Sequence, residues 1–343
     1  MRDIPVGLIG YGFGGSVFHA PLIRRTPGLR LDCVVTSRRE QVERIMPGVR
    51  VLASVQELLA DASIPVVAIS SPTGNHFEHG CAALEAGKHV VMDKPLAVTV
   101  QEAEELMARA NAKGLILTPF QDRRWDGDFL TVRKCVDNGW LGKVYSYEAH
   151  YDRYRPSVAA RWKEQAVYGS GILYDLGPHV IDQALQLFGM PRAVTADILF
   201  QREGAETVDY FHLILDYGKL RAILHSSMLV RQAGPHYAVH GDQGSYLSYG
   251  MDPQEAALMA GKLPGDPGWD ADIAARPGDL YLADGTHRQV ETLPGVWQSY
   301  YAGLSECLHH GGPPPVEPAD ARDGLMVIEA ALRSARERRP VDL

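Results

Sequence analysis

The chain has 343 residues, of which 45% are hydrophobic and 22% are charged, and its formal net charge is −8. This length is enough for two domains and a large core, and the composition is that of an ordinary globular protein. The negative charge argues against a general nucleic-acid or anionic-membrane binder, so we expect neither partner.

The first predicted element is a short buried strand, residues 4–9, that ends in a glycine-rich turn. Gly10, Gly12 and Gly15 fit the pattern G-x-G-x-x-G, in which the glycines permit a tight turn, close approach of a pyrophosphate and close helix–strand packing. The pyrophosphate would lie over the N-terminus of the following helix. We expect Phe13, within the same turn, to bind the cofactor as well. A glycine-rich turn without a ligand is the competing interpretation.

The end of the second predicted strand, residues 31–35, indicates which dinucleotide is bound. NAD sites tend to carry an acidic residue there for the ribose 2′-hydroxyl, but Asp32 lies too early in the strand. Ser37, Arg38 and Arg39 follow instead, and a hydroxyl with two guanidiniums suits a 2′-phosphate. We therefore expect NADP(H) rather than NAD(H). The alternative is a solvated arginine pair at a helix start.

Strands and helices continue to alternate up to about residue 120, which predicts a doubly wound parallel sheet in a domain of residues 1–121. The further strands are expected at residues 49–52, 66–70, 89–92 and 115–118, and the helices at 54–57 onward, 76–86 and 99–112.

The pattern changes in residues 122–343, where several strands follow one another and predict an α/β domain with a large, open, mainly antiparallel sheet. In residues 210–215, alternation places Tyr210 and His212 on one face and Phe211 and Leu213 on the other, so both faces are expected to be largely apolar. One face should pack on helices and the other is available to a partner subunit. The strands are expected at residues 144–154, 192–201, 208–217 and 220–230, and the helices at 126–138, 175–188, 297–309 and 319–338.

Two polar segments follow predicted strand ends, where this type of sheet places its ligands. In the first, Asp93-Lys94-Pro95, the proline restricts the backbone that carries Lys94, whose ammonium could steady a developing alkoxide or donate a proton. A surface lysine before a turn is the alternative. In the second, Ser71, Pro72, Asn75 and His76 could contact ribose or nicotinamide, although His76 is equally suited to a helix N-terminus without a chemical role.

Another group of candidate catalytic residues lies in the predicted helix of residues 175–188. Asp175, His179 and Asp182 are spaced to share one helical face. His179 is a candidate general base, with either aspartate orienting its imidazole. A metal site here lacks an obvious third or fourth ligand, and a structural ion network is the remaining alternative.

Two further stretches, residues 121–125 and 152–156, are dense in hydrogen-bonding side chains. Gln121, Arg123 and Tyr154 are therefore candidate substrate-binding residues for a polyhydroxylated molecule, with a solvated charged face as the competing interpretation. The four cysteines are far apart, which is typical of reduced thiols and predicts neither disulfides nor a zinc site. We expect a cytoplasmic protein, because the first strand leaves no room for a signal peptide and no apolar run reaches transmembrane length.

These motifs together resemble the Gfo/Idh/MocA family, which includes glucose–fructose oxidoreductase and inositol dehydrogenases. The resemblance extends over essentially the whole chain and includes the glycine turn, the strand-end Lys-Pro and the D-x-G-x-H-x-x-D segment that ends at Asp182. Asp93 stands where the family usually has glutamate, and Thr73 where it usually has asparagine, a contact for which Asn75 could compensate. The stretches 18–22, 123–126 and 152–156 look most like the branch with NADP-dependent scyllo-inositol dehydrogenases.

The resemblance implies a Rossmann domain and a C-terminal α/β domain whose sheet builds homodimers or homotetramers. It implies that Lys94, Asp175 and His179 are catalytic in an NADP-dependent oxidoreductase, without a metal, acting on a secondary alcohol of a cyclitol or sugar. An NADP-binding sensor without turnover is one alternative, which the presence of both Lys94 and His179 argues against. A glycosidase-like enzyme that recycles its hydride is another.

Overall fold

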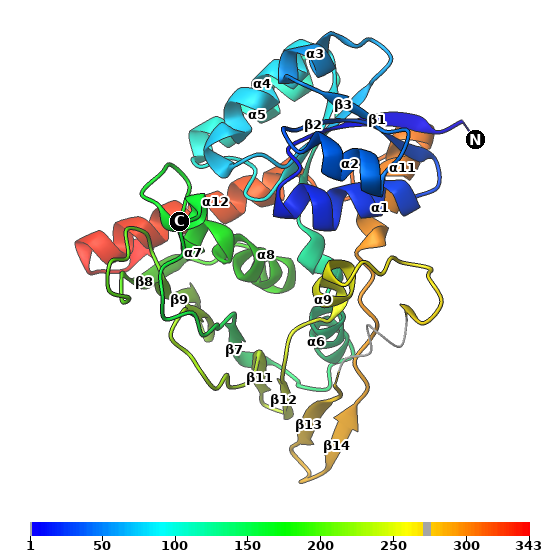
Figure 1. Ribbon diagram of the computed structural model, residues 1–343. Coiled ribbons are helices and arrows are strands. Elements are labelled where there is room, and N and C mark those ends of the chain that lie inside the picture. Colours follow the sequence, from blue (N-terminus) through cyan, green and yellow to red (C-terminus); the bar gives the residue numbers. More distant parts are fainter. Residues whose placement is uncertain (1, 270–275) are drawn as a thin grey trace. The chain divides into compact units, whose positions relative to one another are not determined.

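The computed structural model describes residues 2–269 and 276–343, and the chain forms two compact units (Figure 1). Within the described residues, the first unit comprises 2–122, 254–269 and 297–322, and the second comprises 123–253, 276–296 and 323–343. The predicted domain boundary at residue 121 stays a prediction. No helix in the described part of the chain is long and apolar enough to cross a membrane.

The first unit contains the predicted doubly wound sheet, which is confirmed. Its six strands are all parallel, and their order is β3-β2-β1-β4-β5-β6. The strands are β1 Ile4–Ile9, β2 Leu29–Val35, β3 Arg50–Leu52, β4 Val66–Ile69, β5 His89–Asp93 and β6 Leu117–Phe120. Every side chain of β4 is fully buried, as its continuous apolar sequence predicts for a strand covered on both faces. The strand order reverses between β1 and β4, where such sheets bind ligands.

The first unit also contains helices. They are η1 Gly14–His19, α1 Ala20–Arg25, α2 Arg39–Ile45, α3 Val55–Ala60, η2 Thr73–Asn75, α4 His76–Glu85, α5 Val100–Ala112, α9 Gln254–Met259 and α11 Gln298–His310. A reciprocal capping box fixes the start of α5. The Thr99 hydroxyl accepts a hydrogen bond from the Glu102 N–H, and the Glu102 carboxylate accepts one from the Thr99 N–H. Two elements cross the division between units along the chain, η3 Asp122–Trp125 and α12 Pro318–Glu337.

The second unit is built on a nine-stranded sheet that is mostly antiparallel, as predicted, with β7 and β10 as a parallel pair. Its order is β14-β13-β12-β11-β7-β10-β9-β8-β15. The strands are β7 Val144–His150, β8 Ala193–Leu199, β9 Tyr210–Tyr217, β10 Leu220–Ser227, β11 Tyr237–Gly241, β12 Gly244–Ser248, β13 Gly278–Leu282, β14 His287–Val290 and β15 Val341–Asp342. The helices are α6 Gly127–Asp137, η4 Trp162–Glu164, α7 Ile172–Asp175 and α8 Gly177–Phe188.

The two faces of this sheet differ more than its sequence indicates. Phe211, Leu213 and Leu215 of β9 are fully buried, and α8 packs against the neighbouring strand β10. Tyr210 and His212, on the opposite face, are half-buried. The expectation that both faces are largely apolar is wrong, because neighbouring strands add histidine and carboxylate side chains to the half-buried face.

The predicted helix over residues 175–188 is in fact two helices. The break falls at Leu176, between α7 and α8, and Pro178 occupies the first turn of α8. A proline has no N–H to donate to the preceding turn but is well suited to the start of a helix. Asp175 and His179 therefore lie on different helices, and the prediction that Asp175, His179 and Asp182 share one helical face is wrong.

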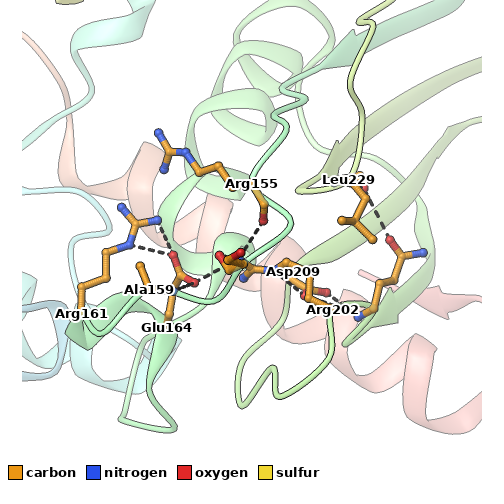
Figure 2. Close-up of polar contacts among 10 residues, drawn as sticks. Arg155, Ala159, Arg161, Glu164, Arg202, Asp209 and Leu229 are labelled. Carbon is orange, nitrogen blue, oxygen red and sulfur yellow. Dashed lines mark hydrogen bonds and ion pairs between the residues drawn. The ribbon is translucent and has the colours of Figure 1, made fainter.

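A buried ion network holds the segment between β7 and α7 in place (Figure 2). The Arg202 guanidinium donates to Asp209 Oδ2 over 2.9 Å and to Glu164 Oε2 over 3.0 Å, and all three side chains are at most 5% exposed. The Arg202 guanidinium also reaches the Arg155 carbonyl, and Glu164 accepts from the Ala159 N–H and the Arg161 guanidinium. Arg202 thus forms ion pairs with two buried carboxylates.

We expect Arg202→Ala to lower the free energy of unfolding by about 3–5 kcal/mol, because it leaves the buried Asp209 carboxylate without its Arg202 cation and leaves Glu164 paired with Arg161 alone. Urea unfolding followed by circular dichroism measures this loss. The matched control is Arg221→Ala, which breaks an exposed ion pair with Asp216 in the same sheet and should change the stability by less than about 1 kcal/mol. Equal effects of the two substitutions would contradict the prediction.

Candidate active site

The glycine turn after β1 has the shape that a dinucleotide requires. Gly10 has a φ of +94°, and a Cβ there would lie 2.5 Å from the Ser70 carbonyl oxygen. A Cβ on Gly15 would collide with the carbonyl of Gly10. Both residues must therefore be glycine for the turn and the following helix to pack against the strands.

Gly12 is different, because a Cβ at this position would meet no protein atom within 4 Å. Packing within the protein therefore does not require glycine at position 12. A pyrophosphate lying against the backbone would require it, because a side chain there would block its close approach. The chain then enters η1 directly, with the Ser16 N–H bonded to the Gly12 carbonyl over 3.0 Å. The turn fits a dinucleotide, with Phe13 half exposed beside it.

The structure separates the two arginines that follow β2. The Arg38 guanidinium donates to the Tyr11 carbonyl over 3.2 Å, so it lies at the glycine turn. Arg39 is directed elsewhere, to the Glu43 carboxylate and the Val51 carbonyl. Ser37 is exposed at the strand end.

Asp32 has a structural environment of its own in β2. It pairs with Arg30 over 2.8 Å and with Arg50 over 2.5 Å. Partial burial acts to raise the pKa of Asp32, but these two guanidiniums outweigh it and hold the pKa below its ordinary value. The carboxylate is therefore already engaged by two protein cations.

The Asp93 carboxylate connects the ends of β4 and β5. It accepts from the Ser70 hydroxyl and from the Lys94 N–H, each over 2.8 Å. The His19 Nε2 atom lies 3.6 Å away, and the Nδ1 atom of the same ring bonds to the Tyr301 hydroxyl over 2.6 Å. Burial acts to raise the pKa of Asp93, but the His19 ring and the nearby Lys94 outweigh it and keep the pKa well below its usual range. The carboxylate therefore stays ionised beside Lys94.

His76 connects the same two strand ends by its ring. It is buried, with Nδ1 2.8 Å from the Pro95 carbonyl and Nε2 3.0 Å from the Ser71 carbonyl. Burial lowers the pKa of His76, and a neutral imidazole has a single N–H, so it donates to one of these carbonyls at a time. The ring lies between the loop that carries Lys94 and the loop that carries Pro72 and Asn75. The Lys94–Pro95 peptide bond is cis.

In the second unit, each predicted aspartate is paired with a cation. Asp175 Oδ1 lies 2.5 Å from the Lys163 ammonium. Asp182 forms a two-pronged pair with the Arg124 guanidinium, over 2.6 and 2.8 Å, and both side chains are buried. The prediction that one of these two aspartates orients His179 stays a prediction.

His179 is buried in the first turn of α8 with an aromatic neighbour. The Tyr151 ring stacks on its imidazole with 6.3 Å between centroids, and the Arg123 guanidinium lies 5.2 Å from the centroid of the same Tyr151 ring. The structure thus brings Arg123 and His179 to one aromatic ring. Tyr154 is instead 43% exposed and accepts from Arg231 over 2.7 Å, while Gln121 is buried in the first unit.

Sequence reasoning missed several residues of these two clusters. His19, Ser70 and Gly14 surround Asp93, and a Cβ on Gly14 would lie 2.6 Å from both the Asp93 carboxylate and the Ser70 hydroxyl. Lys163 and Arg124 were likewise missed as partners of the aspartates. Only Gly14 could have been found from the local sequence, because it lies within the glycine pattern of residues 10–15. The other residues join these clusters through contacts between distant segments.

Comparison with known proteins agrees with this geometry. Residues 4–121 match the family model for the oxidoreductase family NAD-binding Rossmann fold, and residues 133–343 match the model for the oxidoreductase family C-terminal alpha/beta domain. The chain is 45% identical to the scyllo-inositol 2-dehydrogenase (NADP(+)) IolW of Bacillus subtilis, over 99% of this chain and 96% of that protein. It is 44% identical to the oxidoreductase YdgJ of Escherichia coli, over 98% and 97% of the two chains.

A solved structure of the oxidoreductase YvaA from Bacillus subtilis superposes with a TM-score of 0.95 at 43% identity, covering 100% of this chain and 99% of that one. An oxidoreductase structure from Yersinia pestis gives a TM-score of 0.94 at 42% identity, covering 100% and 97%. The chain therefore belongs to the Gfo/Idh/MocA family of oxidoreductases.

Proposed function

We propose that the protein is an NADP-dependent dehydrogenase acting on a secondary alcohol of a cyclitol or sugar, with a scyllo-inositol-type substrate favoured. The observation that carries this proposal is the glycine turn that fits a dinucleotide, with Arg38 directed to it and Lys94 at the end of β5. The name of the Bacillus subtilis relative supports both the cofactor and the substrate class. A homodimer or homotetramer built through the C-terminal sheet, and a cytoplasmic location, accompany this proposal as expectations.

The bound nicotinamide supplies a hydride acceptor for the carbinol carbon. In the proposed reaction His179 accepts the hydroxyl proton, and the Lys94 ammonium stabilises the negative charge that develops on the oxygen. Asp175, paired with Lys163, orients the reacting groups. Ser71, Pro72, Asn75 and the glycine turn are proposed to hold the cofactor, with His76 bracing their loop. Gln121, Arg123 and Tyr154 are proposed to bind the substrate hydroxyls.

Two other functions predict different behaviour. A sensor would bind NADPH without turnover and would need neither Lys94 nor His179. A hydride-recycling glycosidase-like enzyme would cleave its substrate without net change in the cofactor. We favour the dehydrogenase because the chain carries both candidate proton-handling side chains.

The function is tested by following absorbance of the reduced nicotinamide with purified protein, NADP or NAD, and a panel of inositols, pentoses and hexoses. We expect one polyol to reduce NADP much faster than NAD. Tight NADPH binding without turnover on any polyol would favour the sensor. Consumption of a glycoside at constant absorbance would favour the hydride-recycling enzyme.

We expect Lys94→Ala to lower turnover at least about a hundredfold, because a positioned acid–base group contributes on that scale. Lys94→Arg keeps the positive charge but cannot release a proton near neutral pH, so it separates charge stabilisation from proton donation. The control is Lys113→Ala, since Lys113 pairs with Glu85 on the surface of the same unit. Full turnover by a folded Lys94→Ala variant would exclude the proposed role.

We expect Arg38→Ala to lower kcat/KM for NADP by about ten- to a hundredfold, the scale of one lost charge-assisted hydrogen bond, with little change for NAD. Arg39→Ala is the matched control, because its guanidinium is directed to Glu43 and Val51, and we expect a change of less than about threefold. Equal losses for the two cofactors in Arg38→Ala would mean that Arg38 acts only by supporting the glycine turn.

A further inference from the structure

Three histidines form a row across adjacent strands on the half-buried face of the nine-stranded sheet. His150 of β7 is the register partner of His225 of β10, and His225 is the register partner of His212 of β9. Side chains of register partners lie on the same face of a sheet, about 5 Å apart at their Cβ atoms. The sheet pairing therefore gathers imidazoles from segments that are far apart in the chain.

Asp152, just beyond the end of β7, directs its carboxylate at two of these rings. Its Oδ1 lies 3.4 Å from His225 Nε2, and its Oδ2 lies 3.6 Å from His150 Nδ1. One ligand atom from each of the three residues lies within 4.8 Å of the others. Two donors bound tetrahedrally to one zinc ion are about 3.3 Å apart, given metal–ligand distances of about 2.0–2.1 Å. One of the observed separations starts from each Asp152 oxygen, and both are close to the spacing of two ligands of one ion.

Each of these three residues also has an outer partner that holds it in orientation. His150 Nε2, on the far side of its ring, lies 3.5 Å from Glu148 Oε2. His225 Nδ1 lies 3.4 Å from His212 Nδ1, which leaves its Nε2 atom directed toward Asp152. The Asp152 Oδ1 atom accepts from the Ser227 N–H over 3.0 Å. Outer carboxylates and backbone groups of this kind fix ring orientation and tautomer in metal sites.

We propose that His150, Asp152 and His225 form a binding site for a divalent transition-metal ion such as Zn²⁺. Two imidazoles and one carboxylate are suitable ligands for such an ion and leave a position for water. The ion joins the end of β7 to β10 across the face of the sheet. We assign it a structural role, because its ligands come from neighbouring strands and do not include the residues proposed for hydride transfer.

The test is titration of the metal-free full-length protein with Zn²⁺ in competition with a chromophoric chelator. We expect one ion per chain, and at least about a hundredfold weaker binding in His150→Ala and in His225→Ala, since loss even of outer partners costs about ten- to a hundredfold. Asp152→Asn should weaken binding in the same direction. Zn²⁺ should raise the unfolding temperature of the wild type but not of these variants, because an ion that binds only the folded state stabilises it.

The matched control is His287→Gln, which removes a histidine paired with Asp279 in the same sheet, over 3.0 Å. This pair belongs to no three-ligand group within residues 2–269 and 276–343, so Zn²⁺ binding should be unchanged. Circular dichroism establishes that each variant folds, and His225→Gln replaces His225→Ala if the latter does not. Equal Zn²⁺ affinity in the wild type and in folded His150 and His225 variants, or no binding by the wild type at micromolar Zn²⁺, would overturn the proposal.

Discussion

The Asp93 carboxylate fixes the arrangement of the strand ends in the first unit. A buried negative charge is tolerated only where hydrogen bonds and positive charge compensate it, and Asp93 has two hydrogen bonds and the nearby Lys94 ammonium. Its bond to Ser70 ties β5 to β4, and its bond to the Lys94 N–H sets the backbone that carries the candidate catalytic lysine. The Asp93 Oδ2 atom would lie only 2.6 Å from a Cβ on residue 14, so the helix after the glycine turn can approach the strand ends only if that residue is glycine.

His76 completes this arrangement from the other side. Its ring lies between the Pro95 and Ser71 carbonyls, so the loop after β4 and the loop after β5 are joined by a buried side chain as well as by Asp93. A group that is braced in this way loses little orientational freedom when a substrate binds, which is what positioned acid–base catalysis needs. The chemistry proposed for Lys94 therefore depends on two neighbours that need not touch the substrate.

The sequence predicted features that depend on near neighbours in the chain, and it failed where distant segments meet. The glycine turn, the capping box at Thr99 and the buried strand β4 each have a local physical cause. The break before α8 also has a local cause in Pro178, but the helical spacing of Asp175 and Asp182 masked it. The partners of those aspartates, Lys163 and Arg124, could not be predicted, because no periodicity encodes which cation folds against which carboxylate.

In the sheet of the second unit, too, contacts between distant segments could not be predicted from the sequence. Alternation along a strand assigns each side chain to a face, but the rows across a face depend on register, which a single strand does not determine. His150 and His225 become neighbours only because β7 and β10 pair in parallel. Parallel strands need a long connection, so the residues that meet are necessarily distant in the chain. Of the three proposed ligands only His150 and Asp152 are close in the chain, and one such pair lacks the repeated short spacings by which metal sites are recognised in sequences.

The buried ion network of the second unit links its fold to its candidate catalytic cluster. Replacing a buried ion pair by apolar side chains is often neutral or stabilising, so stability alone is a weak explanation for Arg202, Glu164 and Asp209. Their geometry offers a better one, because Glu164 ends the η4 turn that also contains Lys163. Ionic contacts are directional, so they fix where this turn lies, and Lys163 in turn sets the position of the Asp175 carboxylate. In this interpretation the network places the Lys163 ammonium beside Asp175, one of the candidate catalytic residues.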